Sequence, residues 1–204
     1  MEIINSNKEI DKLTKKSNYQ TIKVCLIGID KTGKSSFLDR IFYRDNFKNF
    51  KESIQGKLSS TGLSYHGIFV KYKAKLFRLE FLDTAGQLRY FGVVRILYKE
   101  AHVILNFYDP FKKESFEYVK KFFESLNERK NAFLCSYILI KNKYDLNETK
   151  DEKIMISDEE VLEYADKNNL SFRNLSNLEK YDSGIEEIFE DCINGYLNKN
   201  NNKK

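Results

Sequence analysis

The stretch Val24-Cys25-Leu26-Ile27-Gly28-Ile29-Asp30-Lys31-Thr32-Gly33-Lys34-Ser35-Ser36 decides the fold of this chain. It joins a short apolar run to the pattern G-x-x-x-x-G-K-S, which predicts a strand, a phosphate-binding loop and the start of a helix. Phosphate oxygens require several backbone N–H donors aimed at one point, and the glycines allow the tight turn that aims them. A chance match in a turn is the alternative, which the apolar run and the helical spacing after the loop disfavour.

The loop pattern also assigns chemical roles. Gly28 and Gly33 allow the turn, and Lys34 is placed to reach the β and γ phosphates of a nucleotide. The Ser35 hydroxyl is placed to complete an octahedral oxygen shell around Mg²⁺. These residues predict a nucleotide site but do not identify the base.

A second polar stretch, Asp83-Thr84-Ala85-Gly86-Gln87, follows the apolar alternation of residues 76–82. The Asp83 carboxylate can hold Mg²⁺ through water, Gly86 lets a backbone N–H approach a γ-phosphate, and Gln87 can orient an attacking water. An Asp at the end of a strand is, on its own, more often a cap or turn residue. The phosphate loop earlier in the chain favours the functional interpretation.

A third stretch, Asn142-Lys143-Tyr144-Asp145, follows the apolar run 133–140 and indicates the base. The Asp145 carboxylate can accept N1–H and the exocyclic amino hydrogens of guanine, a pair that adenine does not offer. Lys143 can lie over the purine face, and Asn142 can tie this loop to the phosphate loop. The pattern N-K-x-D is weak alone, because lysine and asparagine are abundant here, but it is specific after a strand in this position.

Apolar runs alternate with helical patterns along the whole chain. We predict six strands, at 22–27, 63–72, 76–82, 103–108, 133–140 and 170–175, and helices at about 34–42, 93–98, 116–126, 157–165 and 183–197. This alternation predicts an α/β fold with a mostly parallel six-stranded sheet, about five helices on both faces, and the ligand at the carboxyl ends of the strands.

The rest of the chain suggests loops and tails. We expect residues 1–20 to be a flexible extension that can contain a short helix, 21–197 to be one domain, and 198–204 to be a flexible polar tail. The polar segment 43–62 is long for a loop inside a compact domain, and such loops are usually functional.

Composition narrows the class of protein. The 204 residues are 41% hydrophobic and carry a net charge of +5, but the lysines are scattered, so we expect no nucleic-acid partner. Cys25, Cys135 and Cys192 lie far apart and predict reduced, mostly buried thiols. With no apolar run of roughly 20 residues and no cysteine box for prenylation at the end, we expect a cytoplasmic monomer that reaches membranes only through partners.

The three motifs, in this order and spacing, resemble those of the Ras superfamily of small GTPases, most closely the Rab branch. The resemblance covers about residues 20–197 and includes D-T-A-G-Q-L-R-Y-F-G-V-V-R-I-L-Y-K-E-A-H-V-I-L-N-F-Y-D and S-G-I-E-E-I-F. It implies the P-loop NTPase (small G-protein) fold and a nucleotide switch in vesicle trafficking or related signalling. In such a switch GTP and Mg²⁺ order two loops, hydrolysis to GDP releases them, and effector, exchange-factor and GTPase-activating proteins read the difference.

The resemblance also implies a role for each matched residue. The phosphates are bound by Gly28, Asp30, Lys31, Thr32, Gly33, Lys34, Ser35, Ser36 and Gly86. Guanine is bound by Asn142, Lys143, Asp145, Ser176 and Asn177. Mg²⁺ is held by Ser35, Asp83 and a switch hydroxyl, and Gln87 is the catalytic residue that orients water.

The switch hydroxyl is ambiguous, because the loop before it is about seven residues longer than is usual in the family. Counting back from Asp83 favours Ser60, and Thr61 fits if the following hairpin is one residue shorter. Counting forward from Ser35 reaches Ser53 instead. We prefer Thr61 or Ser60.

Asp30 occupies a position where the family usually has Gly, Ser or Ala. A carboxylate there would lie near the γ-phosphate and crowd Gln87 or an incoming arginine finger, which leads to the hypothesis of slow hydrolysis. The alternative is that Asp30 faces solvent or pairs with Lys31. The guanine loop Ser176-Asn177-Leu178 lacks the usual lysine, which we expect to weaken nucleotide binding.

Two other functions fit parts of the sequence. One is a pseudo-GTPase scaffold or interaction module with constitutively bound nucleotide, in which the long loop and the tails provide the binding surface. The other is an adenine-specific P-loop kinase, which the stretch Asn142 to Asp145 and the lack of an arginine-rich lid disfavour.

Overall fold

A computed structural model of the chain describes residues 1–4, 7–16, 18–44, 55–58, 63–83, 100–127, 135–143, 156–176 and 184–201. Its strands are β1 (Glu2–Ile4), β2 (Tyr19–Ile27), β3 (Gln55–Leu58), β4 (Leu63–Tyr72), β5 (Lys75–Asp83), β6 (Val103–Tyr108), β7 (Ser136–Lys141) and β8 (Ser171–Asn174). Its helices are α1 (Asn7–Lys16), α2 (Lys34–Asp39), the π-helical turn η1 (Arg40–Arg44), α4 (Lys113–Asn127), α5 (Asp158–Asn168) and α6 (Ile185–Asn201).

One sheet runs through the molecule, in the order β1-β4-β5-β2-β6-β7-β8, with β3 paired to β4 beside this path. Strands β5, β2, β6, β7 and β8 are parallel, whereas β4 pairs antiparallel with β5, β1 and β3. The predicted α/β fold is confirmed, but in the described residues the sheet has eight strands instead of six, because β1 and β3 extend it beside β4. All parallel strands end at the same edge, which carries the phosphate loop, Asp83 and Asn142.

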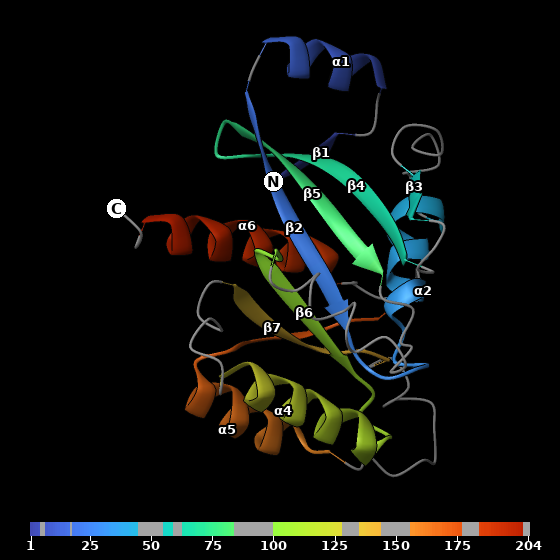
Figure 1. The fold of residues 1–204 in the computed structure, drawn as a ribbon, viewed down its shortest axis with the longest axis vertical. Coiled ribbons are helices and arrows are strands. Elements are labelled where there is room, and N and C mark those ends of the chain that lie inside the picture. Colours follow the sequence, from blue (N-terminus) through green and yellow to red (C-terminus); the bar gives the residue numbers. More distant parts are fainter. Residues whose placement is uncertain are drawn as a thin grey trace.

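Helices cover both faces of the sheet (Figure 1). On one face α2 and α6 pack on the alternate residues of β2 and β6, such as Leu26 and Phe107, in the largest apolar cluster. On the other face α4 packs on the intervening residues, such as Ile27 and Ile104. This arrangement follows from the continuous apolar runs of the central strands, which are buried on both sides.

The N-terminal segment differs from the expected flexible extension. Residues Glu2–Ile4 form β1, which pairs with Phe69–Lys71 of β4, and α1 follows at the top of Figure 1. Ile4 is only 2% exposed, and Ile10 of α1 belongs to the same apolar cluster. The sparse isoleucines of this segment therefore stabilise it by burial against the sheet instead of by local helix propensity.

Other boundaries also shift. The predicted helix 34–42 is split into α2 and the π-helical turn η1, and α6 continues to Asn201, into the segment expected to be a tail. Ser157 caps α5, since its Oγ accepts the Glu160 N–H at 3.2 Å. The predicted helix 93–98 lies outside the described residues.

The three cysteines are free and buried, as predicted. Within the described ranges, none of the helices combines the length and the apolar character that a bilayer crossing requires.

Candidate nucleotide-binding site

The phosphate loop connects the end of β2 to the start of α2, and its glycines fit positions that other residues cannot occupy. Gly28 has φ +148°, and a Cβ there would lie 2.5 Å from the Phe107 carbonyl oxygen and 2.8 Å from Thr32 Oγ1. Gly33 has φ 92° and is the N-cap of α2. The loop can therefore pass this close to β6 only with glycine at position 28. Gly33 then starts α2, so the amino end of that helix faces the loop.

Lys34 lies inside this loop with only 4% of its surface exposed. Its Nζ donates to the Gly28 carbonyl at 2.7 Å and to the Ile29 carbonyl at 2.9 Å. Burial lowers the Lys34 pKa, while the charges of Asp83 and Asp30 act in the opposite direction. A buried cation surrounded by carbonyls gains from an added anion, so this loop fits a phosphate group.

Ser35 and Asp83 meet beside Lys34, although they are 48 residues apart in sequence. The Ser35 Oγ donates to Asp83 Oδ2 at 3.1 Å, and the hydroxyl is exposed. The register of β2 with β5, which pairs Leu26 with Asp83, produces this contact. A hydroxyl and a carboxylate are hard oxygen ligands, so this pair suits Mg²⁺ held together with phosphate oxygens.

Asn142 connects the predicted base-binding loop to the phosphate loop, as predicted. Its Nδ2 donates to the Thr32 carbonyl at 2.7 Å, and its own N–H donates to the Tyr108 carbonyl at 3.1 Å. Thr32 is held in turn, since its Oγ1 donates to the Ile29 carbonyl at 2.8 Å. The two loops therefore form one connected unit at the carboxyl ends of β2, β6 and β7.

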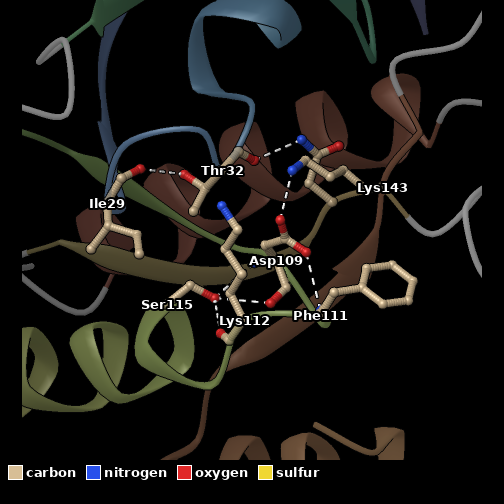
Figure 2. A network of polar contacts seen from close by, with 8 residues as sticks. Ile29, Thr32, Asp109, Phe111, Lys112, Ser115 and Lys143 are labelled. Carbon is tan, nitrogen blue, oxygen red and sulfur yellow. Dashed lines mark hydrogen bonds and ion pairs between the residues drawn. The ribbon is translucent and has the colours of Figure 1, made fainter. Parts of the chain in front are cut away.

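Lys143 pairs with Asp109, a residue that the sequence analysis did not assign to the site (Figure 2). The Lys143 Nζ lies 2.6 Å from Asp109 Oδ2, and Asp109 directly follows β6. The signal that could have found it is its position, since Asp83 likewise stands at the carboxyl end of a parallel strand, β5.

Ser176 lies at the end of β8 and is fully buried. Its carbonyl accepts a hydrogen bond from Arg40 Nη1 at 2.6 Å, and the preceding Leu175 N–H donates to the Lys141 carbonyl at 2.8 Å. Arg40 is a second residue that the sequence analysis did not identify. It is the first residue of η1, so it ties Ser176 to the segment that follows α2.

The sequence model of the Ras family matches residues 23–198 of this chain, which include the phosphate loop, Asp83, Asn142 and Ser176. The chain belongs to the Ras family.

Individual relatives of this Ras-family chain are similar over most of its length. It is 32% identical to the Ras-related protein Rab-1 of Theileria parva over 168 residues, which cover 82% of this chain and 70% of the relative. It is 30% identical to the GTP-binding protein YPT52 of Saccharomyces cerevisiae, over 83% and 79% of the two chains. It is 32% identical to the Ras-related protein RABA4b of Arabidopsis thaliana, over 89% and 75%.

This Ras-family chain is a small GTPase of Rab-like type, and its ligand is a guanine nucleotide. Of the other predicted site residues, Asp30, Lys31 and Ser36 are exposed on the phosphate loop and at the start of α2. The remaining ones lie outside the described residues: Ser53, Ser60, Thr61, Gly86, Gln87, Asp145 and Asn177.

Proposed function

We propose that this GTPase is a monomeric Rab-like switch of vesicle trafficking or related signalling, which binds GTP and GDP with Mg²⁺ and hydrolyses GTP slowly. Effector, exchange-factor and GTPase-activating proteins are its partners, and through them it reaches membranes from the cytoplasm. The observation that carries the proposal is the convergence of Lys34, the Ser35–Asp83 pair and the Asn142–Thr32 bond at one edge of the sheet. The Rab names of the relatives support the cellular role.

We assign the residues of the site as follows. The phosphate loop and Lys34 bind the phosphates, with Gly86 at the γ-phosphate and Gln87 orienting water. Asn142, Lys143 and Asp145 bind guanine, together with the backbone at Ser176 and Asn177. Residues 21–197 form the GTPase domain.

Mg²⁺ fits the oxygen pair of Ser35 and Asp83, with Thr61 or Ser60 as the switch ligand. When bound, it neutralises charge that develops on the phosphate oxygens. The chain's own contribution is positional, because the bonds of Lys34 to Gly28 and Ile29 keep its ammonium in the loop before the nucleotide arrives.

Slow hydrolysis is attributed to Asp30. The Asp30 side chain is exposed, as the alternative expected, but its charge still acts on buried Lys34 in the same loop. A carboxylate at this position repels the γ-phosphate and takes space that an attacking water or an arginine finger needs.

Asp30→Gly tests this assignment. We expect the variant to hydrolyse bound GTP about tenfold faster than the native chain, which corresponds to a barrier lower by about 1.4 kcal/mol. The measurement is phosphate release from preloaded protein in a single turnover with Mg²⁺. Asp166→Asn, which removes an exposed carboxylate of α5 that is not assigned to the site, is the control and is expected to keep the native rate.

Equal rates for Asp30→Gly and the native chain would remove Asp30 as the cause. GTP that remains uncleaved in both proteins over many hours would favour the scaffold alternative. A native intrinsic rate on the order of 10⁻⁴ s⁻¹ or above would contradict slow hydrolysis itself.

A further inference from the structure

We propose that Asp109 is a positioning residue for nucleotide binding, which holds the Lys143 ammonium in place beside the guanine base. The inference rests on the proposed function, because it assumes that Lys143 meets the base. It adds a residue from the end of β6 to a site otherwise built from the phosphate loop and the residues after β7. Figure 2 shows the contacts that carry the argument.

Three hydrogen bonds, to Phe111 and Ser115, hold Asp109 in place. Its Oδ1 accepts the Phe111 N–H at 3.1 Å, and its backbone N–H donates to Ser115 Oγ at 3.0 Å. Ser115 lies in the first turn of α4, and its Oγ also lies 2.9 Å from the Asp109 carbonyl oxygen. With 3% of its side chain exposed, this carboxylate has little freedom to follow a moving partner.

Lys143 is the mobile member of the pair. A lysine side chain rotates about several bonds and loses much conformational freedom when it is fixed. Its ion pair with Asp109, 2.6 Å long, fixes the ammonium end of the side chain before a ligand binds, while 31% of the side chain stays exposed for contact with that ligand. A ligand that finds the side chain already in place avoids this ordering cost on binding.

The backbone of Lys143 shows the same constraint. Its φ of 61° is left-handed, which is unfavourable for a residue with a Cβ. The preceding Asn142 is anchored to the phosphate loop through Thr32, so the ion pair and the amide bond hold consecutive residues to different strand ends. Asp109 thereby links the position of the base to that of the phosphates.

A purely structural clamp is the competing explanation, and the chain contains a matched control for it. Lys141 and Asp158 form a second lysine–aspartate pair, also at 2.6 Å, two residues before Lys143. Its lysine is 3% exposed, so this pair stabilises the end of β7 without offering a cation to a ligand. Loss of either pair loosens the same region, but only loss of the first affects Lys143.

The test compares Asp109→Asn with Asp158→Asn in the full chain loaded with ribose-labelled fluorescent GDP and Mg²⁺. We expect Asp109→Asn to release GDP at least tenfold faster than the native chain, and Asp158→Asn to stay within twofold. Hydrolysis of bound GTP in a single turnover should remain within twofold in Asp158→Asn, because its lysine partner offers no cation to a ligand. An unchanged release rate in Asp109→Asn, or an equal increase in Asp158→Asn, would overturn the proposal.

A double-mutant cycle with Lys143→Met tests whether Asp109 acts through the lysine. In the Lys143→Met background, Asp109→Asn should change GDP release by less than twofold; a further tenfold increase there would overturn the proposal. If Asp109→Asn does not fold, Ser115→Ala replaces it, with a smaller increase in release expected and no change contradicting it. If the native chain binds no guanine nucleotide, the proposed function itself fails, a result distinct from native binding that Asp109→Asn leaves unaltered.

Discussion

Asn106 is a polar residue in the middle of a buried strand. It lies on β6 between Ile27 of β2 and Leu139 of β7, and it is fully buried. Neither its amide nitrogen nor its amide oxygen has a hydrogen-bond partner in the described part of the chain. A buried amide without partners costs free energy, and a β-branched apolar residue fits the same position in a central strand.

Asn106→Val should therefore raise the free energy of unfolding by about 1–2 kcal/mol. Denaturant titration followed by circular dichroism measures this difference. Asn106→Ala, which removes the amide but leaves a cavity, should gain less. A valine variant less stable than the native chain would show that the amide is satisfied in the folded protein.

At the level of single residues, the sequence predicted the contacts that a motif encodes. The contact of Asn142 with the phosphate loop was predicted, because both belong to recognisable motifs, but its partner there, the Thr32 carbonyl, was not. The Asp109–Lys143 pair was not predicted, because Asp109 belongs to none of the three motifs. The two residues are 34 positions apart, and only the pairing of β6 with β7 shows that their ends are neighbours.

The β4–β5 hairpin contains a local conflict between sequence and backbone. Its turn residues Lys73 and Ala74 have φ 47° and 63°, both in the left-handed region. Tight hairpins with two such residues favour Asn-Gly, because a Cβ is unfavourable there. Tertiary pairing along the whole of β4 and β5 imposes the turn in spite of its residues.

Ala74→Gly should therefore raise the free energy of unfolding, by about 0.5–1 kcal/mol. Thermal unfolding of the variant against the native chain is the measurement. The matched control is Ala165→Gly in α5, where the same substitution should lower stability because glycine disfavours a helix interior. A loss of stability in both variants would show that Ala74 is not strained.

The N-terminal elements illustrate why some structure could not be predicted. A strand of three residues has no periodicity of its own, and Ile10 and Leu13 are the only apolar residues of α1. Both elements exist because β4 offers a free edge and an apolar surface, which only the assembled sheet provides. By contrast, the central strands are long apolar runs and α4 repeats apolar residues at helical spacing, so the sequence alone was sufficient to predict them.

At the scale of the whole molecule, buried thiols make the stability depend on pH. Burial raises the pKa of Cys25 to about 12 and that of Cys135 to about 11, and it raises the pKa of Cys192 further. In the unfolded chain these thiols ionise near pH 8.5. Above that pH the unfolded chain loses protons that the folded chain keeps, so stability falls as pH rises.

Each thiol should lower the free energy of unfolding by about 1.4 kcal/mol per pH unit between about pH 9 and pH 11. Lysines and tyrosines titrate there too, so the comparison is between the native chain and Cys135→Ser. We expect a shallower decline in the variant, measured by denaturant titration at each pH. Parallel curves would mean that Cys135 ionises equally in the folded and unfolded states.

The position of the site at one edge of the sheet is the feature that the sequence predicted best. Parallel strands must end at one edge, so three motifs that each follow a strand had to meet there. Which hydroxyl completes the switch could not be predicted, because the long segment 43–62 makes counting from either side ambiguous. Ser53, Ser60 and Thr61 all lie outside the described residues.

The most direct test of the central claim is the identity of the nucleotide that the purified chain carries. The protein is denatured, the released nucleotide is identified by chromatography, and a second sample is first treated with EDTA to remove Mg²⁺. We predict close to one equivalent of GDP or GTP per chain in the untreated sample, and rapid loss of that nucleotide after EDTA. An adenine nucleotide, or no nucleotide together with no binding of added GDP, would contradict the account.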